Sequence, residues 1–405
     1  MKISVQNFGI ISNASVEVNG ISLIAGANDS GKSTIGKIFY SIVRGFNPEE
    51  TVFVTEKNEF IRELYQQILR ILRDNKAIDI TNFQTTKVNE EWTKNVRQII
   101  EKFEGQQKNR LNTYCVLLEK EFNVEFDSIS SKIREVSRYF SIEFNDEISP
   151  IFNNKKVSRI LLEDLEGSTT IEYSYVLDIN RNISTFFTNS FFIETPSLIN
   201  NSLQESILFE ERFSREKEAH LKFALANESS FIGFDEKNDK ENDEIITIIS
   251  KIILGELIID DFSGVIYKKN GHQINIDNVA LGIKGFGLIQ LLLKNKQLNE
   301  RTLLIIDEPE IHLHPNWQVL YAEILVLLSK KLEIPILLTS HSPYFIEALK
   351  AFSEKYNFQD KTNFYFSEKS KDGLTAQIVD VSDDISPILM SISEAHFKIS
   401  DIDNE

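Results

Sequence analysis

The feature that most constrains this chain is a glycine-rich loop held between a strand pattern and a helix pattern. The loop is the string GANDSGKST at residues 26–34, which fits the Walker A pattern. The apolar run 21–25 before it predicts a buried strand, and apolar residues at helical spacing after it predict a helix ending near Gly45. Because the amides of such a loop and of a helix N-terminus point at the same place, the segment predicts a phosphate-binding cradle.

Within this loop, the candidate phosphate contacts are Gly26, Asn28, Ser30, Gly31, Lys32, Ser33 and Thr34. Lys32 would place a positive charge beside the β- and γ-phosphates, and the Ser33 hydroxyl would bind Mg²⁺. The same string can arise as an accidental turn. The strand and helix patterns that flank it in register argue against that alternative.

A second element of the site, an acidic pair at the end of a strand, comes some 270 residues later in the chain. The apolar run 303–306 predicts a strand buried on both faces, and it delivers Asp307 and Glu308 at its C-terminal end, where open α/β sheets bind ligands. Asp307 would hold Mg²⁺, directly or through water, and Glu308 would orient and deprotonate an attacking water. The alternative, an acidic pair that only ends a strand before Pro309, is disfavoured by the glycine loop in the same chain.

A third element follows one helix later. Residues 334–339 predict another buried strand, which Ser-His-Ser-Pro at 340–343 ends at the same sheet edge. We therefore expect His341 to hydrogen-bond the γ-phosphate or the water, rather than to be an ordinary loop histidine.

Three strings together resemble a known family: GANDSGKST, LLIIDEPEIHLHP at 303–315 and LLTSHSPYF at 337–345. They are similar to the ABC-type ATPases of the SMC/RecF/OLD group, and especially to stand-alone bacterial ATPases related to OLD proteins and to PtuA of the Septu defence system. The likeness covers about residues 1–45 and 255–405. It implies an α/β, ABC-type ATPase head with a mixed sheet, an antiparallel β element at the N-terminus, and ATP and Mg²⁺ as ligands.

The resemblance also implies a homo-oligomer, at least a head-to-tail dimer that encloses two nucleotides. Its signature turn would fall at 278–287, where Gly282 and Lys284 would reach the partner's γ-phosphate. Leu281 stands where the family has a small hydroxyl residue, which implies slow ATP turnover. The alternative for this stretch is a glycine-rich turn before a core helix. Residues 194–196 occupy about the place of the family's Q-loop, without its glutamine.

Between the two ends, helical patterns run from about residue 56 to 140, with interruptions at 78–86 and Gly105. They predict a compact inserted helical subdomain rather than a long coiled-coil arm. We expect the head to comprise 1–50 and 165–405 in two lobes, the insertion 51–164, and a mobile acidic loop 233–245.

Composition narrows the choice of partners and compartment. The net charge of −17 argues against broad nucleic-acid binding, although a local basic groove stays possible. No apolar run reaches the about 18 residues of a membrane span, and the single cysteine, Cys115, suits a reducing cytoplasm. His312 and His314 have the spacing of metal ligands, but we expect them to form the turn before the Pro315 helix.

Together with the ATP-site motifs, the resemblance to OLD and PtuA ATPases implies an ATP-hydrolysing sensor or regulator in a bacterial anti-phage defence or toxin-control system. Only a hairpin at 364–381 and a short helix follow His341, too little for the nuclease domain of OLD proteins, so a separate effector such as a nuclease is expected. The alternative is a RecF/SMC-like repair ATPase that binds DNA directly. A transporter's coupling ATPase is disfavoured by the string at 340–343.

Overall fold

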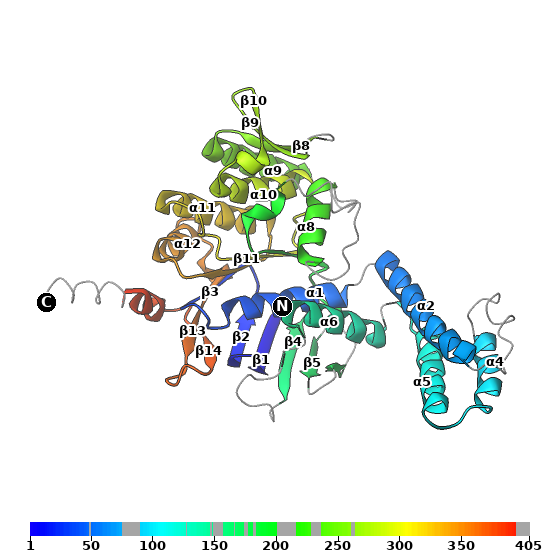
Figure 1. Cartoon of the computed structure of the whole chain (residues 1–405). Coiled ribbons are helices and arrows are strands. Elements are labelled where there is room, and N and C mark those ends of the chain that lie inside the picture. The colour runs from blue at the N-terminus through cyan, green and yellow to red at the C-terminus, as the bar shows by residue number, and fades with distance from the viewer. Residues whose placement is uncertain are drawn as a thin grey trace, which may run out of the picture. The chain divides into compact units, whose positions relative to one another are not determined.

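The computed structural model divides the chain into two compact units, Met1–Phe46 with Val136–Glu405, and Asn47–Glu135 (Figure 1). It describes residues 1–47, 50–74, 90–126, 128–145, 148, 157–165, 167–173, 177–180, 184–200, 216–227, 236–260 and 264–393. The helical unit is shorter than the expected 51–164, because residues 158–164 and 167–173 form strands of the other unit's sheet. Within the described residues, no helix has the length and apolarity needed to cross a membrane.

The first unit is built on one mixed sheet of 11 strands in the order β6-β5-β4-β1-β2-β14-β13-β3-β12-β11-β7. The strands are β1 (Lys2–Phe8), β2 (Ile11–Glu17), β3 (Ile21–Gly26), β4 (Ser158–Asp164), β5 (Gly167–Tyr173), β6 (Leu177–Ile179), β7 (Asn189–Ile193), β11 (Thr302–Asp307), β12 (Ile336–Ser340), β13 (Thr362–Lys369) and β14 (Ala376–Asp380). From β7 to β13 neighbours are parallel, whereas β2, β1, β4, β5 and β6 pair antiparallel. The expected α/β fold with a mixed sheet and an antiparallel N-terminal hairpin is confirmed.

The first unit also contains helices and a second, smaller sheet. The helices are α1 (Lys32–Phe46), α6 (Ile129–Phe144), α8 (Glu216–Ala226), α9 (Glu236–Ile253), α10 (Leu281–Lys294), α11 (Pro315–Leu332) and α12 (Pro343–Lys355), with single turns η1 (Pro196–Ile199), η2 (Ile276–Asn278) and η3 (Gln359–Lys361). A second sheet of three strands has the order β10-β9-β8, with β8 (Glu256–Asp260), β9 (Gly264–Lys269) and β10 (His272–Asn275).

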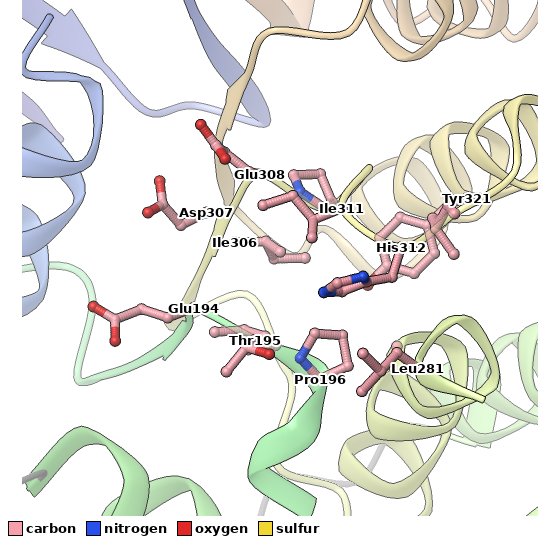
Figure 2. Close-up of a pocket in the computed structure, with 14 residues that line it drawn as sticks. Glu194, Thr195, Pro196, Leu281, Ile306, Asp307, Glu308, Ile311, His312 and Tyr321 are labelled. Carbon is pink, nitrogen blue, oxygen red and sulfur yellow. The ribbon is translucent and has the colours of Figure 1, made fainter. Parts of the chain in front are cut away.

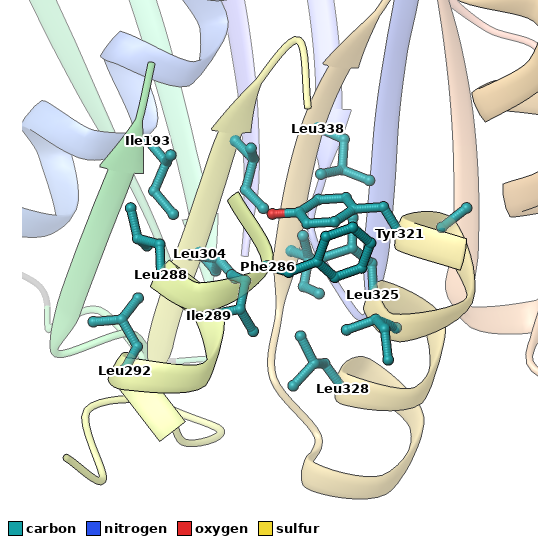
Figure 3. Packing of buried hydrophobic residues seen from close by; sticks show 14 of the residues in the cluster. Ile193, Phe286, Leu288, Ile289, Leu292, Leu304, Tyr321, Leu325, Leu328 and Leu338 are labelled. Atoms are coloured by element: carbon teal, nitrogen blue, oxygen red, sulfur yellow. The ribbon is translucent and has the colours of Figure 1, made fainter. Parts of the chain in front are cut away.

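The parallel strands are buried on both faces because alternate side chains meet different helices. Leu304 and Ile306 belong to the large core with residues of α10, α11 and α12. Figure 3 shows Phe286 of α10 and Tyr321 of α11 in this core, together with Leu304. Ile305 faces the other way, toward α1. A Cβ at Gly36 of that helix would lie 3.1 Å from the Ile305 side chain, so the glycine lets α1 approach the sheet closely.

The expectation of a mobile acidic loop at 233–245 is wrong from residue 236 onward. Residues 236–253 form α9, and 233–235 lie outside the described residues. Glutamate and lysine are good helix formers, so a charged composition alone does not distinguish a loop from an exposed helix. Glu244 then pairs with Lys331 of α11 at 2.6 Å, which ties the charged half of α9 to the core helices.

The second unit consists of α2 (Glu50–Asp74), α4 (Glu90–Ile100), α5 (Gly105–Phe122) and the start of α6. Its core is an apolar cluster that includes Ile68, Trp92, Leu111 and Cys115. Burial raises the pKa of the Cys115 thiol to about 11. The thiol is therefore a packing group in this core.

Candidate active site

The glycine loop joins β3 to α1 and takes backbone conformations that only glycine adopts easily. Gly26 and Gly31 have φ angles of 154° and 84°. A Cβ at Gly26 would lie 2.7 Å from the Ser367 carbonyl oxygen, and one at Gly31 would lie 2.9 Å from Ile11. The strand, the loop and the helix are therefore packed into a fixed cradle, with Lys32 as the first residue of α1.

The polar groups of the loop suit an anionic ligand. Lys32 is buried, and its Nζ donates to the Ala27 carbonyl oxygen at 2.8 Å. Burial lowers the pKa of Lys32, and the nearby carboxylates, Glu308 first, oppose that shift. Ser30 is 1% exposed, and its hydroxyl has no hydrogen-bond partner within the described part of the chain. Asn28 is exposed and Thr34 is half-buried.

The two ends of the chain meet at Asp307, the last residue of β11. The Ser33 hydroxyl donates to Asp307 Oδ1 at 2.9 Å across 274 residues of sequence. The Thr339 hydroxyl of β12 donates to the same oxygen, because Asp307 and Thr339 are register partners in parallel strands. A hydroxyl and a carboxylate oxygen this close are the hard oxygen ligands that Mg²⁺ prefers, so the residues present fit that ion.

Glu308 follows in a left-handed conformation, with φ 49°, which is uncommon for a residue with a side chain. Its amide donates to the Thr339 carbonyl at 3.2 Å and to the Thr339 hydroxyl at 3.1 Å. Its Oε1 lies 3.3 Å from His341 Nδ1. Strained residues of this kind persist where their surroundings hold them, and they gather at functional sites.

The structure therefore brings Ser33, Lys32, Asp307, Glu308 and His341 to one sheet edge. Sequence reasoning missed two further residues there, Thr339 and Glu310. Thr339 could have been found from the parallel pairing of β11 with β12, but the pairing itself is not visible in one sequence.

The expected signature segment has a different conformation. Residues 281–287 are not a turn but the first two turns of α10, which begins at Leu281. Gly282 packs against Leu313 and Trp317, and a Cβ at Gly287 would lie 2.4 Å from Leu257. These glycines are therefore close-packing positions in a helix rather than turn residues.

Lys284 is placed away from the expected contact. Its side chain is buried, and Nζ donates to Asn200 Oδ1 at 2.7 Å. Burial lowers the pKa of this lysine. The expectation that Lys284 reaches a partner's γ-phosphate is wrong, because the helix turns its side chain inward.

A pocket of about 190 Å³ opens beside Asp307, between the end of β11, the segment after β7 and the start of α10 (Figure 2). Glu194, Thr195 and Pro196 line it, so the segment expected at the place of the Q-loop lies next to Asp307 and Glu308. The Glu194 carboxylate is held by Lys217 of α8 at 2.7 Å.

The two histidines before α11 take structural positions. His314 is the N-cap of the helix, and its Nδ1 accepts from the Asn316 amide at 3.3 Å. His312 lines the pocket with φ 68°, within the turn that leads to His314. The expected structural interpretation of this pair agrees with these contacts.

Comparison with known proteins gives one family match and several solved structures. The family model described as "AAA ATPase domain" matches residues 1–346. A structure titled as an Smc head bound to the C-winged helix domain of ScpA is 13% identical, covers 94% of this chain and 96% of its own, and has a TM-score of 0.44. An Smc head domain with an extended coiled coil from Pyrococcus furiosus is 12% identical, covers 98% of both chains, and has a TM-score of 0.41. The SMC head domain from Thermotoga maritima is 10% identical, covers 94% of this chain and 98% of its own, and has a TM-score of 0.38.

Proposed function

Because this chain belongs to the family of AAA ATPase domains, we propose that it binds Mg·ATP at the cradle between residues 26 and 34 and uses hydrolysis to change its association with other subunits. ATP hydrolysis itself follows from membership of the family, which accounts for most of the chain. The observation that supports the rest is the 2.9 Å hydrogen bond between Ser33 and Asp307, beside the buried Lys32.

Binding uses groups that are already in place. We expect the Lys32 ammonium to move from the Ala27 carbonyl to a phosphate oxygen, and the Ser30 hydroxyl and the loop amides to donate to the phosphates. Ser33 and Asp307 would hold Mg²⁺, which neutralises phosphate charge when it is bound.

Hydrolysis then depends on the pair Glu308 and His341. Glu308 accepts the proton of the attacking water, the water oxygen bonds to the γ-phosphorus, and the bond to the β–γ bridging oxygen breaks. His341, whose Nδ1 lies 3.3 Å from Glu308, hydrogen-bonds the γ-phosphate or the water. The strained backbone of Glu308 keeps its carboxylate at the strand end, where this proton transfer requires it.

The γ-phosphate would control the association of two copies of the chain. We propose that two copies close head to tail, with the first turn of α10 of one copy facing the nucleotide of the other. The N-cap residue of α10, Ala280, makes no side-chain hydrogen bond to the amides of that turn, and the Gly282 amide is one of them. Loss of the γ-phosphate removes the bridge and loosens the pair.

The biological role that we propose is that of a sensor or regulator in a bacterial anti-phage defence or toxin-control system, acting on a separate effector such as a nuclease. The motif strings support this role by their likeness to OLD and PtuA ATPases. The net charge of −17 supports a protein effector over broad DNA binding.

The experiment compares three variants purified from the native host: Glu308→Gln to hold ATP, Lys32→Ala to prevent binding, and Glu347→Gln, at an exposed position of α12, as the matched control. With ATP, Glu308→Gln is expected to elute as a dimer or larger assembly and to retain a co-purified effector, and Lys32→Ala is not. A gel shift on the isolated chain covers the alternative. Tight, ATP-dependent DNA binding with no protein effector would favour a RecF/SMC-like repair ATPase.

A further inference from the structure

Glu310 lies on the short turn that follows β11, two residues after the proposed base. The turn is closed by two backbone hydrogen bonds, from Ile311 N to the Glu308 carbonyl and from Leu313 N to the Glu310 carbonyl, both at 3.0 Å. Glu310 itself is 5% exposed. Its side chain is directed under the turn, toward the loop between β12 and α12, as its contacts show.

One oxygen of Glu310 accepts three hydrogen bonds from that loop. Oε1 accepts from the Ser340 hydroxyl at 2.7 Å, the His341 amide at 2.8 Å and the Ser342 amide at 3.2 Å. The other oxygen, Oε2, is buried with no hydrogen-bond partner in the described part of the chain. The polar contacts of this carboxylate with the protein are therefore made to three consecutive loop residues. The loop also starts α12, whose N-terminal dipole favours a negative group at this place.

A second buried side chain anchors the same loop from α11. The Ser342 hydroxyl donates to Gln318 Oε1 at 2.6 Å, and Gln318 Nε2 donates to the Leu313 carbonyl at 3.0 Å. Ser340 and Ser342 are buried, whereas the His341 side chain is 44% exposed. The loop is thus held on both sides of His341, and the imidazole is presented outward beside Glu308.

We propose that Glu310 is a positioning residue that fixes His341 against Glu308, so that the turn after β11 and the loop after β12 move as one piece. The proposal rests on the proposed ATPase mechanism. Without the carboxylate, the His341 amide loses its acceptor, and the Ser342 amide keeps only the Ser340 hydroxyl at 3.1 Å. The imidazole is then no longer held 3.3 Å from Glu308. Because His341 is needed for hydrolysis and not for holding Lys32 or Ser33, the loss should fall on kcat and spare the KM for ATP.

The kinetic test uses Glu310→Ala, Glu310→Gln, His341→Ala and the double variant, with Glu347→Gln as control. We expect Glu310→Ala to lower kcat about 10- to 100-fold with KM within about threefold, a fraction of what loss of a direct transition-state donor costs. Glu310→Gln keeps a carbonyl acceptor and is expected to recover much of kcat. In the His341→Ala background, Glu310→Ala should change kcat by less than about twofold, because residues that act as one unit are not additive.

The structural test is hydrogen exchange of the backbone amides of Ser340, His341 and Ser342 in the same full-length variants. We expect faster exchange in Glu310→Ala, partial protection in Glu310→Gln, and wild-type exchange in Glu347→Gln. The proposal is overturned if exchange is unchanged, if kcat and KM worsen together, or if Glu310→Ala costs the His341→Ala enzyme as much as it costs the wild type. Should the wild type prove not to hydrolyse ATP, the mechanism fails, and the exchange data alone decide whether Glu310 holds the loop.

Discussion

Thr339→Val is a sharp test of how Asp307 is held, because the two side chains have nearly the same shape. Thr339 is 1% exposed on β12, and its hydroxyl donates to Asp307 Oδ1. The same hydroxyl accepts from the Glu308 amide at 3.1 Å, but that amide keeps the Thr339 carbonyl at 3.2 Å after the change. The change therefore removes one donor from Asp307, which keeps Ser33, and leaves the Glu308 amide with one acceptor.

The size of the effect follows from the kind of hydrogen bond removed. A bond to a charged group contributes about 1.5–3 kcal/mol, which corresponds to about a 10- to 150-fold change in the fraction of Asp307 in its present position. Since Asp307 would hold Mg²⁺ together with Ser33, we expect the Mg²⁺ concentration for half-maximal ATPase activity to rise at least about tenfold. ATPase rate against Mg²⁺ concentration at saturating ATP measures this directly.

Thr339→Ser is the matched control, because it keeps the hydroxyl and loses only a methyl group. It is expected to retain a Mg²⁺ dependence close to that of the wild type. The reasoning is refuted if Thr339→Val needs no more Mg²⁺ than the wild type. It is also refuted if Thr339→Ser is impaired equally, since the methyl packing would then be responsible.

Three other outcomes are expected. Glu308→Gln should bind ATP but hydrolyse it at least about 100-fold more slowly and accumulate as an associated species in light scattering; normal turnover would assign the base to another residue. Leu281→Ser, at the first residue of α10, should raise the hydrolysis rate; an unchanged rate would separate this turn from a partner's nucleotide. Cys115, with its pKa raised to about 11, should resist a thiol reagent at pH 8 in the native protein and react fully in denaturant. The reason is that only about one thiol in 1,000 is ionised at pH 8 in the folded protein. Rapid labelling of the native protein would contradict the packed core of the second unit.

Much of the site could be predicted because its signals are local in sequence. The strand before Gly26, the helix after Lys32 and the strand that ends at Asp307 each carry their own periodicity and turn residues. The closeness of Ser33 to Asp307 then follows from one rule, that parallel strands end at a common edge.

The rest depended on tertiary contacts that one sequence does not reveal. The α10 glycines suggested a turn at 278–287, yet they allow close approach of Leu257 and Leu313. The helix therefore begins at Leu281, inside that segment, and turns Lys284 inward. The pairing of β4 with β1 also joins residues far apart in sequence. Because of it, the helical unit ends at residue 135 instead of the expected 164. Glu310 lacked any local signal, because its role is defined by a loop about 30 residues away.

The central claim, that one triphosphate is gripped by residues from both ends of the chain, is tested most directly by calorimetric titration of Mg·ATP. Three proteins are compared: the wild type, Lys32→Ala, and Lys37→Ala farther along α1 as the control. The account predicts saturable binding of one ATP per chain to the wild type and the control, and no measurable binding to Lys32→Ala. Equal binding by Lys32→Ala, or none by the wild type, would contradict it.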